Sequence, residues 1–123
     1  MRKRDAAVRW ALCGLLLSGC TRHVAPVTPG APTGPAVGMV RESLNFTAAT
    51  TDPQSDSVRY RFDWGDALGD WTGLLASGES CTAGHTWFVR DTYTVRVQAE
   101  DVHGNSSEWS PGHVVSIESL CRR

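Results

Sequence analysis

The 123-residue sequence has a single lysine, Lys3, and no apolar run long enough to cross a bilayer as a helix. A membrane-spanning helix needs about 20 apolar residues, and the apolar segment at residues 11–17 is far shorter. Glycine-rich phosphate loops, His-Glu-x-x-His and Cys-x-x-Cys motifs are all missing, which removes the usual signatures of nucleotide, zinc-protease and redox sites. Because the cysteines, serines and histidines also fall into no catalytic spacing, the sequence predicts no catalytic residues and a protein that is not an enzyme.

The N-terminus has the order of parts that is typical of a signal peptide. Basic residues precede the short apolar segment, and small residues follow it. The run Leu17-Ser18-Gly19-Cys20 resembles the lipobox of bacterial lipoproteins, in which the cysteine is acylated and becomes the new N-terminus. The resemblance implies several acyl chains, which together hold a protein firmly on a membrane. We therefore expect residues 1–19 to be a lipoprotein signal peptide and Cys20 to be the lipidated residue. The resemblance also implies that Thr21, in place of Asp, favours the outer membrane of the cell envelope over the inner membrane.

Processing at Cys20 would leave eight basic and twelve acidic residues, a net charge of −4. Nucleic acids and anionic lipid headgroups attract clustered Lys and Arg, so the composition predicts no nucleic-acid partner. The partners expected are the membrane, through the lipid on Cys20, and a protein or glycan of the cell envelope.

Proline and glycine are concentrated directly after Cys20. Residues 20–38 have little apolar mass and interleave four prolines with three glycines, a composition typical of an extended linker. We expect this segment to be a tether that carries the acylated cysteine. Residues 39–119 are then long enough for one small domain, and residues 120–123 form a polar tail.

The expected domain alternates apolar and polar residues with the period of a half-buried β-strand. The clearest alternation runs through residues 58–64 and 93–99, and shorter stretches lie at 44–48 and 115–117. Turn-forming residues separate these stretches, and no amphipathic helical period of useful length occurs. The pattern predicts an all-β fold, an immunoglobulin-like β-sandwich of about seven antiparallel strands.

Four short segments within this domain form a recognisable pattern. The segment YRFDWGDA at residues 60–67 is similar to the YxWDFGDG signature of the PKD (polycystic kidney disease) repeat family, with the two aromatic residues exchanged. HTW at residues 85–87, DTYTVRV at 91–97 and EDVHG at 100–104 resemble its later elements in order and spacing. The resemblance covers roughly residues 43–118 and implies a sandwich of the PKD or fibronectin type III kind, but it implies little about function because such folds host many roles.

Three positions depart from the family pattern. Ala67 and Asp91 stand where the family has glycine, and Ser55 stands where relatives often have Asp-Gly. Alanine tolerates a positive φ poorly. We therefore expect the turn at Ala67 to be built differently.

Acidic loops offer one candidate site. Asp52, Asp56 and Asp101 fall in turns that the strand order can bring to one end of the sandwich. Calcium takes six to eight oxygen ligands, so these residues are candidates for a calcium site. The alternative is that the aspartates only orient their own turns, in which case the protein needs no cofactor.

Aromatic and arginine side chains offer a second candidate site. Trp71 and Trp109 lie in polar contexts, and the neighbouring strands present Arg59, Arg61 and Arg96 outward. Guanidinium groups stack on indole rings, and clusters of this kind form either a local cover of the sheet or a binding face.

Single histidines and cysteines receive structural predictions. The resemblance implies a structural role for His85 at the end of a strand, and the alternation turns His113 toward the interior. Exported chains meet oxidising conditions, but the expected strand order puts Cys81 and Cys121 at opposite ends of the sandwich. We therefore expect Cys81 to be unpaired within the chain and Cys121 to be a free or intermolecularly paired tail thiol.

Two hypotheses about function follow from these observations. In the first, the protein is a non-catalytic, membrane-anchored lipoprotein whose immunoglobulin-like module contacts a protein or glycan or serves as a spacer. In the alternative, it is a calcium-binding accessory domain that uses the acidic loops.

Overall fold

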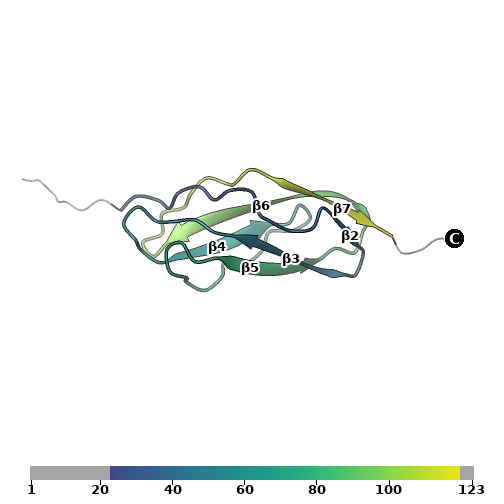
Figure 1. Cartoon of the computed structure of the whole chain (residues 1–123), viewed down its shortest axis with the longest axis horizontal. Coiled ribbons are helices and arrows are strands. Elements are labelled where there is room, and N and C mark those ends of the chain that lie inside the picture. Colours follow the sequence, from purple (N-terminus) through teal and green to yellow (C-terminus); the bar gives the residue numbers. More distant parts are fainter. Residues whose placement is uncertain (1–22, 120–123) are drawn as a thin grey trace, which may run out of the picture.

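The computed structural model of the chain describes residues 23–119, which form six β-strands and no helix (Figure 1). None of these residues therefore belongs to a helix that could span a membrane. The strands are β2 (Val37–Met39), β3 (Ser43–Ala48), β4 (Val58–Asp63), β5 (Cys81–Thr86), β6 (Asp91–Asp101) and β7 (His113–Glu118).

The strands form two sheets, as an immunoglobulin-like sandwich requires. One sheet has the order β2-β7-β6-β4, and β3 pairs with β5 in the other. All pairs are antiparallel except β2 with β7, which is parallel. The predicted all-β sandwich is confirmed, whereas the expectation of about seven strands, all antiparallel, differs from the six strands described. Residues 68–75 run along the edge of β4 without forming a strand of their own. They join β4 through isolated bridges of Asp63 with Leu68 and Val58 with Leu75 and through backbone hydrogen bonds from Gly69 and Thr72.

The core lies between the sheets and follows the predicted alternation. In β4 every second side chain is buried, and the same holds in β3 and the second half of β6. Tyr93 is only partly buried, because its hydroxyl reaches out to donate a hydrogen bond to the Val89 carbonyl at 2.6 Å. The largest fully buried side chains are Trp87, Tyr60, Phe46 and Phe62.

The segment predicted to be a tether is part of the domain over the residues that the structure describes. Pro29 and Pro32 are fully buried, Thr33 exchanges two backbone hydrogen bonds with Thr47 at 2.8 Å, and β2 pairs with β7. The prediction of a free tether is therefore wrong for residues 23–38. Their proline rings supply apolar surface to the core, and their backbone groups find partners on β3 and β7. The signal peptide, Cys20 and the tail lie outside the described residues.

The turn after β4 is built around a different residue from the one that the family pattern suggests. Gly65 takes the positive φ of 90°, and the backbone N–H of Trp64 donates to the Ala67 carbonyl at 2.9 Å. Ala67 itself needs no positive φ, in agreement with the prediction. Ser55 does adopt a positive φ, of 60°, in the loop before β4, so this departure carries some backbone strain.

Candidate functional site

Two groups of polar side chains come together in the structure. The first, the acidic end, consists of Asp52, Asp56 and Asp101 at the end of the sandwich where β6 ends and β4 begins. The second, the Trp–Arg face, consists of Arg59, Arg61, Trp71 and Trp109 on the outer side of β4.

The acidic end contains the three residues that the sequence singled out for calcium. One carboxylate oxygen from each of the three lies within 4.8 Å of the others. Asp52 and Asp101 are 4% and 2% exposed, a depth at which carboxylates need compensating interactions. The predicted meeting of these three loops is thus correct, and the residues are the right type to ligate a hard cation.

Asp101 is held by backbone and side-chain donors of the loop that follows it. Its Oδ1 accepts hydrogen bonds from the backbone N–H groups of His103 at 2.8 Å and Asn105 at 3.0 Å, and Oδ2 accepts one from Asn105 Nδ2 at 3.2 Å. Burial alone would raise the pKa of this carboxyl, but these hydrogen bonds outweigh it and hold the pKa below the ordinary value. Asp101 is therefore a charged, preorganised carboxylate.

The turn that contains Asp52 explains the position of only one of its two carboxylate oxygens. Its Oδ2 accepts hydrogen bonds from the backbone N–H groups of Gln54 at 2.9 Å and Asp56 at 3.1 Å, the turn-forming role expected of an aspartate. Its Oδ1 is buried and has no hydrogen-bond partner among the described residues. Turn formation thus explains one oxygen of Asp52 and leaves the other unexplained.

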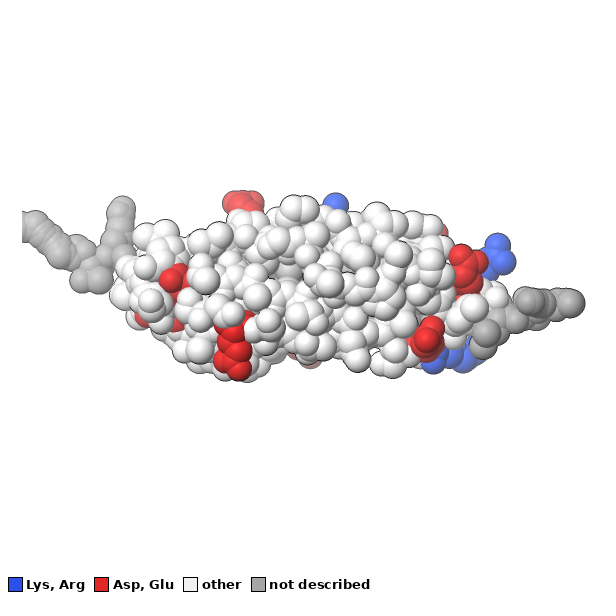
Figure 2. Space-filling model, viewed as in Figure 1, with Lys and Arg blue, Asp and Glu red and all other residues white. Residues whose placement is uncertain are grey.

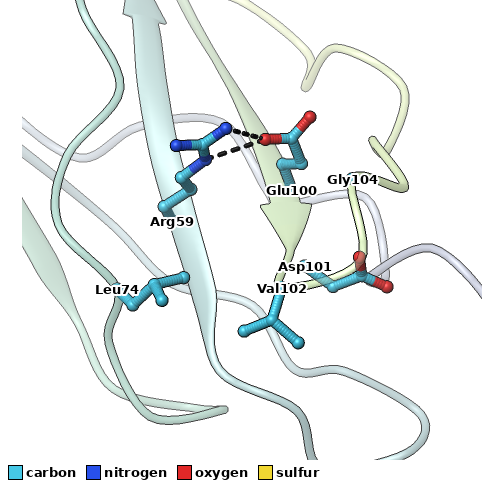
Figure 3. A pocket seen from close by; sticks show the side chains of 6 residues that line it. All are labelled: Arg59, Leu74, Glu100, Asp101, Val102 and Gly104. Carbon is cyan, nitrogen blue, oxygen red and sulfur yellow. Dashed lines mark hydrogen bonds and ion pairs between the residues drawn. The ribbon is translucent and has the colours of Figure 1, made fainter.

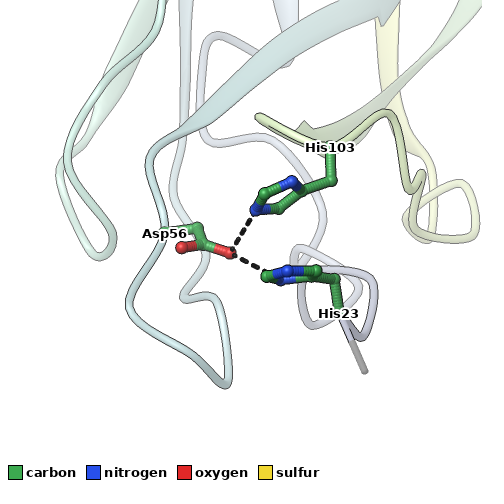
Figure 4. A group of neighbouring side chains, drawn as sticks. All are labelled: His23, Asp56 and His103. Atoms are coloured by element: carbon green, nitrogen blue, oxygen red, sulfur yellow. Dashed lines mark ion pairs between the residues drawn. The ribbon is translucent and has the colours of Figure 1, made fainter. Parts of the chain in front are cut away.

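Two histidines complete the acidic end, and sequence reasoning missed both. Figure 4 shows His23 and His103 converging on Asp56. His23 Nδ1 lies 3.6 Å and His103 Nε2 3.5 Å from the same oxygen, Asp56 Oδ2, and the two rings stack with centroids 3.5 Å apart. His23 falls in the segment predicted to be a tether, so no local pattern placed it beside the loop that holds His103.

A shallow pocket separates the acidic end from the Trp–Arg face. Figure 3 shows Arg59 paired with Glu100, Leu74 and Val102 below this pair, and the Asp101 carboxylate turned away from it. Arg59 Nε donates to Glu100 Oε1 at 2.8 Å, and a second guanidinium nitrogen reaches the same oxygen. The arginine and the glutamate of the pocket wall thus neutralise each other.

The Trp–Arg face is a stack of planar groups. The Trp71 ring has the guanidinium carbon of Arg59 5.0 Å and that of Arg61 4.6 Å from its centroid, and Arg61 also lies 5.7 Å from Trp109. Among the described residues Arg96 contacts neither indole in this way. The register pairs it with Asp63, beyond the Arg61–Gln98 pair, so the alternation predicted its direction correctly but its membership of the cluster wrongly.

The other histidines have structural roles, as predicted. His85 Nε2 lies 2.9 Å from Asp66 Oδ1, and its ring stacks on Trp64 with centroids 4.8 Å apart. His113 is partly buried, with its Nε2 2.8 Å from the Pro35 carbonyl oxygen. Among residues 23–119, neither histidine belongs to a group of three or more side chains that could hold a metal ion.

Cys81 is free and buried at the start of β5, in agreement with its predicted unpaired state. Burial raises the pKa of its thiol, which makes it a poor nucleophile and a poor metal ligand in the folded state. Cys81 pairs with Ala48 at the end of β3, whereas Ile117 of β7 pairs with Asp91 at the start of β6. The two residues therefore lie at opposite ends of the sandwich. Cys121, like Cys20, lies outside the described residues.

Comparisons with known proteins agree with this fold. The chain matches the PKD domain family over residues 27–114. The PKD domain of an M14-like peptidase from Thermoplasmatales archaeon SCGC AB-540-F20 is 36% identical, with a TM-score of 0.71 over 78% of this chain and 98% of that one. A CARDB domain from Pyrococcus furiosus, described in complex with di-metal ions, is 14% identical, with a TM-score of 0.56 over 82% of this chain and 100% of its own, and shares the fold alone.

No curated protein matches the chain. The family match starts at residue 27, inside the segment that the sequence suggested was a tether, which agrees with the packing of that segment on the sandwich. PKD domains are non-catalytic modules of extracellular proteins. The fold, the sequence motifs and the matched residues together show that this chain belongs to the PKD domain family.

Proposed function

We propose that the protein is a non-catalytic, lipid-anchored module of the cell envelope that uses the Trp–Arg face to contact a protein or glycan. The family supports the non-catalytic, extracellular part of this proposal. The observation that carries the contact surface is the placement of Trp71 against two guanidinium groups on the outer side of β4.

Contacts within the protein hold both arginines of the Trp–Arg face in place. Glu100 of β6 holds Arg59, and Gln98 Oε1 accepts a hydrogen bond from Arg61 Nε at 3.3 Å. Trp71 and Trp109 are both partly exposed. A partner would therefore meet large planar groups that intramolecular contacts already hold, which lowers the cost of binding. Tryptophan and arginine are also the residues most enriched among interface hot spots.

Retention of partners from the cell envelope tests this face. The full chain should retain a specific envelope protein or glycan, and Trp71→Ala should reduce the retained amount at least tenfold. Phe88→Ala is the matched control, because Phe88 is 67% exposed but lies outside the face. Protease and glycosidase treatment of the bound material separates the two partner classes. Equal retention by Trp71→Ala and wild type would instead favour the spacer role.

The lipid anchor is tested at Cys20. The proposal expects the full chain to fractionate with membranes and to carry acyl groups, and expects Cys20→Ala to abolish the acylation. Cys121→Ser is the control, because Cys121 lies in the polar tail, far from the lipobox. A wild-type chain that is not acylated would disprove the anchor and the outer-membrane location together, while leaving the Trp–Arg face to be judged separately.

A calcium site at the acidic end is the second candidate function. The observation that favours it is the buried Asp52 Oδ1, which lacks a partner in the described part of the chain and belongs to a group of three close carboxylates. Calorimetric titration with calcium should show binding that Asp52→Asn weakens, because the amide offers one oxygen fewer. Absence of calcium binding to the wild type would leave the aspartates with their turn-forming roles alone.

A further inference from the structure

The group His23, Asp56 and His103, called here the His–Asp–His cluster, contains a polar atom that the protein leaves unsatisfied. Asp56 Oδ2 is shielded from solvent and has no hydrogen-bond partner among the described residues. Leaving a buried acceptor unpaired is costly, and a charged acceptor more so. The two imidazole nitrogens nearest to it stop at 3.5 and 3.6 Å, beyond the range of a normal hydrogen bond.

These separations are close to the spacing of ligands around one small cation. Zinc binds imidazole nitrogen and carboxylate oxygen at about 2.0–2.2 Å in tetrahedral geometry, which puts neighbouring ligand atoms roughly 3.3–3.5 Å apart. The three ligand atoms all lie within 4.8 Å of one another. The His–Asp–His cluster is therefore too open for hydrogen bonds but of the right size for an ion between the three groups.

The surroundings also favour a cation. Asp52 and Asp101 lie directly beside Asp56. On the face seen in Figure 2, the left-hand end of the described residues shows acidic atoms, and the arginines in view lie elsewhere. His23 and His103 side chains are 37% and 41% exposed, so an ion can enter from solvent and keep a water as a further ligand. A shared ion requires one nitrogen of each ring to point at it. The two stacked rings, whose planes now differ by 26°, therefore have to rotate relative to each other on binding. Their exposure leaves room for that rotation.

We propose that His23, Asp56 and His103 form a binding site for one divalent transition-metal ion of the zinc class. Two imidazoles and a carboxylate suit zinc and its neighbours, whereas calcium takes oxygen ligands alone. The site is separate from the Trp–Arg face and goes beyond the proposed function. It joins the segment before β2 to the loops before β4 and after β6, so the ion ties the N-terminal segment to the domain.

Zinc titration of the full chain, without a histidine tag and at pH 7.5, tests the site. We expect one zinc ion per chain by calorimetry, with His23→Ala and His103→Ala each weakening the affinity at least tenfold, since even the loss of an outer partner costs about 10–100-fold at metal sites. His85→Ala is the matched control. It removes a histidine that also contacts an aspartate but has no second histidine beside it, and it should change the affinity less than twofold.

A second measurement keeps the result independent of folding. The ring proton resonances of His23 and His103 should shift on addition of zinc, while those of His85 and His113 should not. Asp70→Asn should leave the zinc affinity in place, because Asp70 is exposed and belongs to neither group of metal-ligating side chains at this end. The proposal is overturned if zinc does not bind, or if the folded double variant His23→Ala/His103→Ala binds zinc as tightly as the wild type.

Discussion

The two ends of β4 carry similar contacts between histidine and aspartate with opposite outcomes. Past the end of β4, His85 and Asp66 meet at 2.9 Å, and Trp64 holds the imidazole ring by stacking. Before the start of β4, His23 and His103 approach Asp56 only to 3.6 and 3.5 Å, and the carboxylate oxygen between them is buried without a hydrogen bond. The same residue types are therefore satisfied at one end and unsatisfied at the other.

The difference lies in what positions each histidine. His85 sits within β5, and its ring lies against two core tryptophans, Trp64 and Trp87. His23 and His103 sit in loops and contact each other instead of the core. A histidine fixed by a strand and aromatic neighbours can be brought to hydrogen-bond distance and acts as structure. Histidines on loops at an acidic surface keep the freedom that a ligand needs.

Removing the platform under His85 should have the largest effect. Trp64→Ala deletes a side chain that is 5% exposed and contacts Phe62, Phe46, Trp87 and His85. We expect a loss of about 3–5 kcal/mol in the free energy of unfolding, measured by urea denaturation. This is a large fraction of the stability of a small domain.

The same substitution on the outer side of the sheet is the control. Trp71→Ala removes a partly exposed ring held by two cation–π contacts, and it should cost only about 1–2 kcal/mol. Equal losses for the two variants would mean that Trp64 is not part of the core and that His85 is not held by it.

The second prediction concerns Asp101 and its pH dependence. Asp101→Ala leaves the N–H donors of His103 and Asn105 without their acceptor, and we expect a loss of about 2–3 kcal/mol at pH 7. The folded-state pKa of Asp101 lies below its ordinary value. Its contribution is therefore complete above about pH 3.9, the pKa of an unfolded aspartate, and is lost as the pH falls through the folded-state pKa.

Unfolding curves measured between pH 7 and pH 2 should show this loss. The difference in the free energy of unfolding between wild type and Asp101→Ala should become smaller as the pH falls. Asp70→Ala serves as the reference, because Asp70 is exposed and its removal should leave the wild-type pH dependence unchanged. A gap that widens on acidification would contradict the assigned direction of the pKa shift.

The strands and their core could be predicted from the sequence because they obey a local rule. Val58, Tyr60 and Phe62 are all buried, as the period of two requires, and the three aspartates meet because turns at one end of a sandwich are neighbours. The segment at residues 23–38 could not be predicted in this way. Its composition is that of a linker, and only the long-range contacts of Pro29, Pro32 and Thr33 show that it belongs to the domain.

The histidines of the candidate site were missed for the same reason. His23 depends on the packing of that segment, and no local pattern relates it to His103. Arg96 shows the converse error. Because Arg96 alternates with Val95 and Val97, the sequence predicted which side of the sheet its side chain faces. Whether Arg96 joins the Trp–Arg face depends on its position along the strand, which only the pairing with Asp63 fixes.

The prediction with the smallest expected effect on stability compares the aspartates at the two ends of β4, Asp66 and Asp56. Asp66→Asn removes a charge-assisted hydrogen bond between side chains that are 35% and 19% exposed. In the presence of a chelator at pH 8, we expect its free energy of unfolding to fall by about 0.5–1 kcal/mol. Asp56→Asn removes an oxygen that has no hydrogen bond to lose, so its free energy of unfolding should change by less than about 0.5 kcal/mol. Zinc should then stabilise the wild type and Asp66→Asn against urea but not Asp56→Asn, because a ligand that binds only the folded state adds RT ln(1 + [L]/Kd) to its stability. A larger loss for Asp56→Asn than for Asp66→Asn without metal would mean that the His–Asp–His cluster is already satisfied by its own charges.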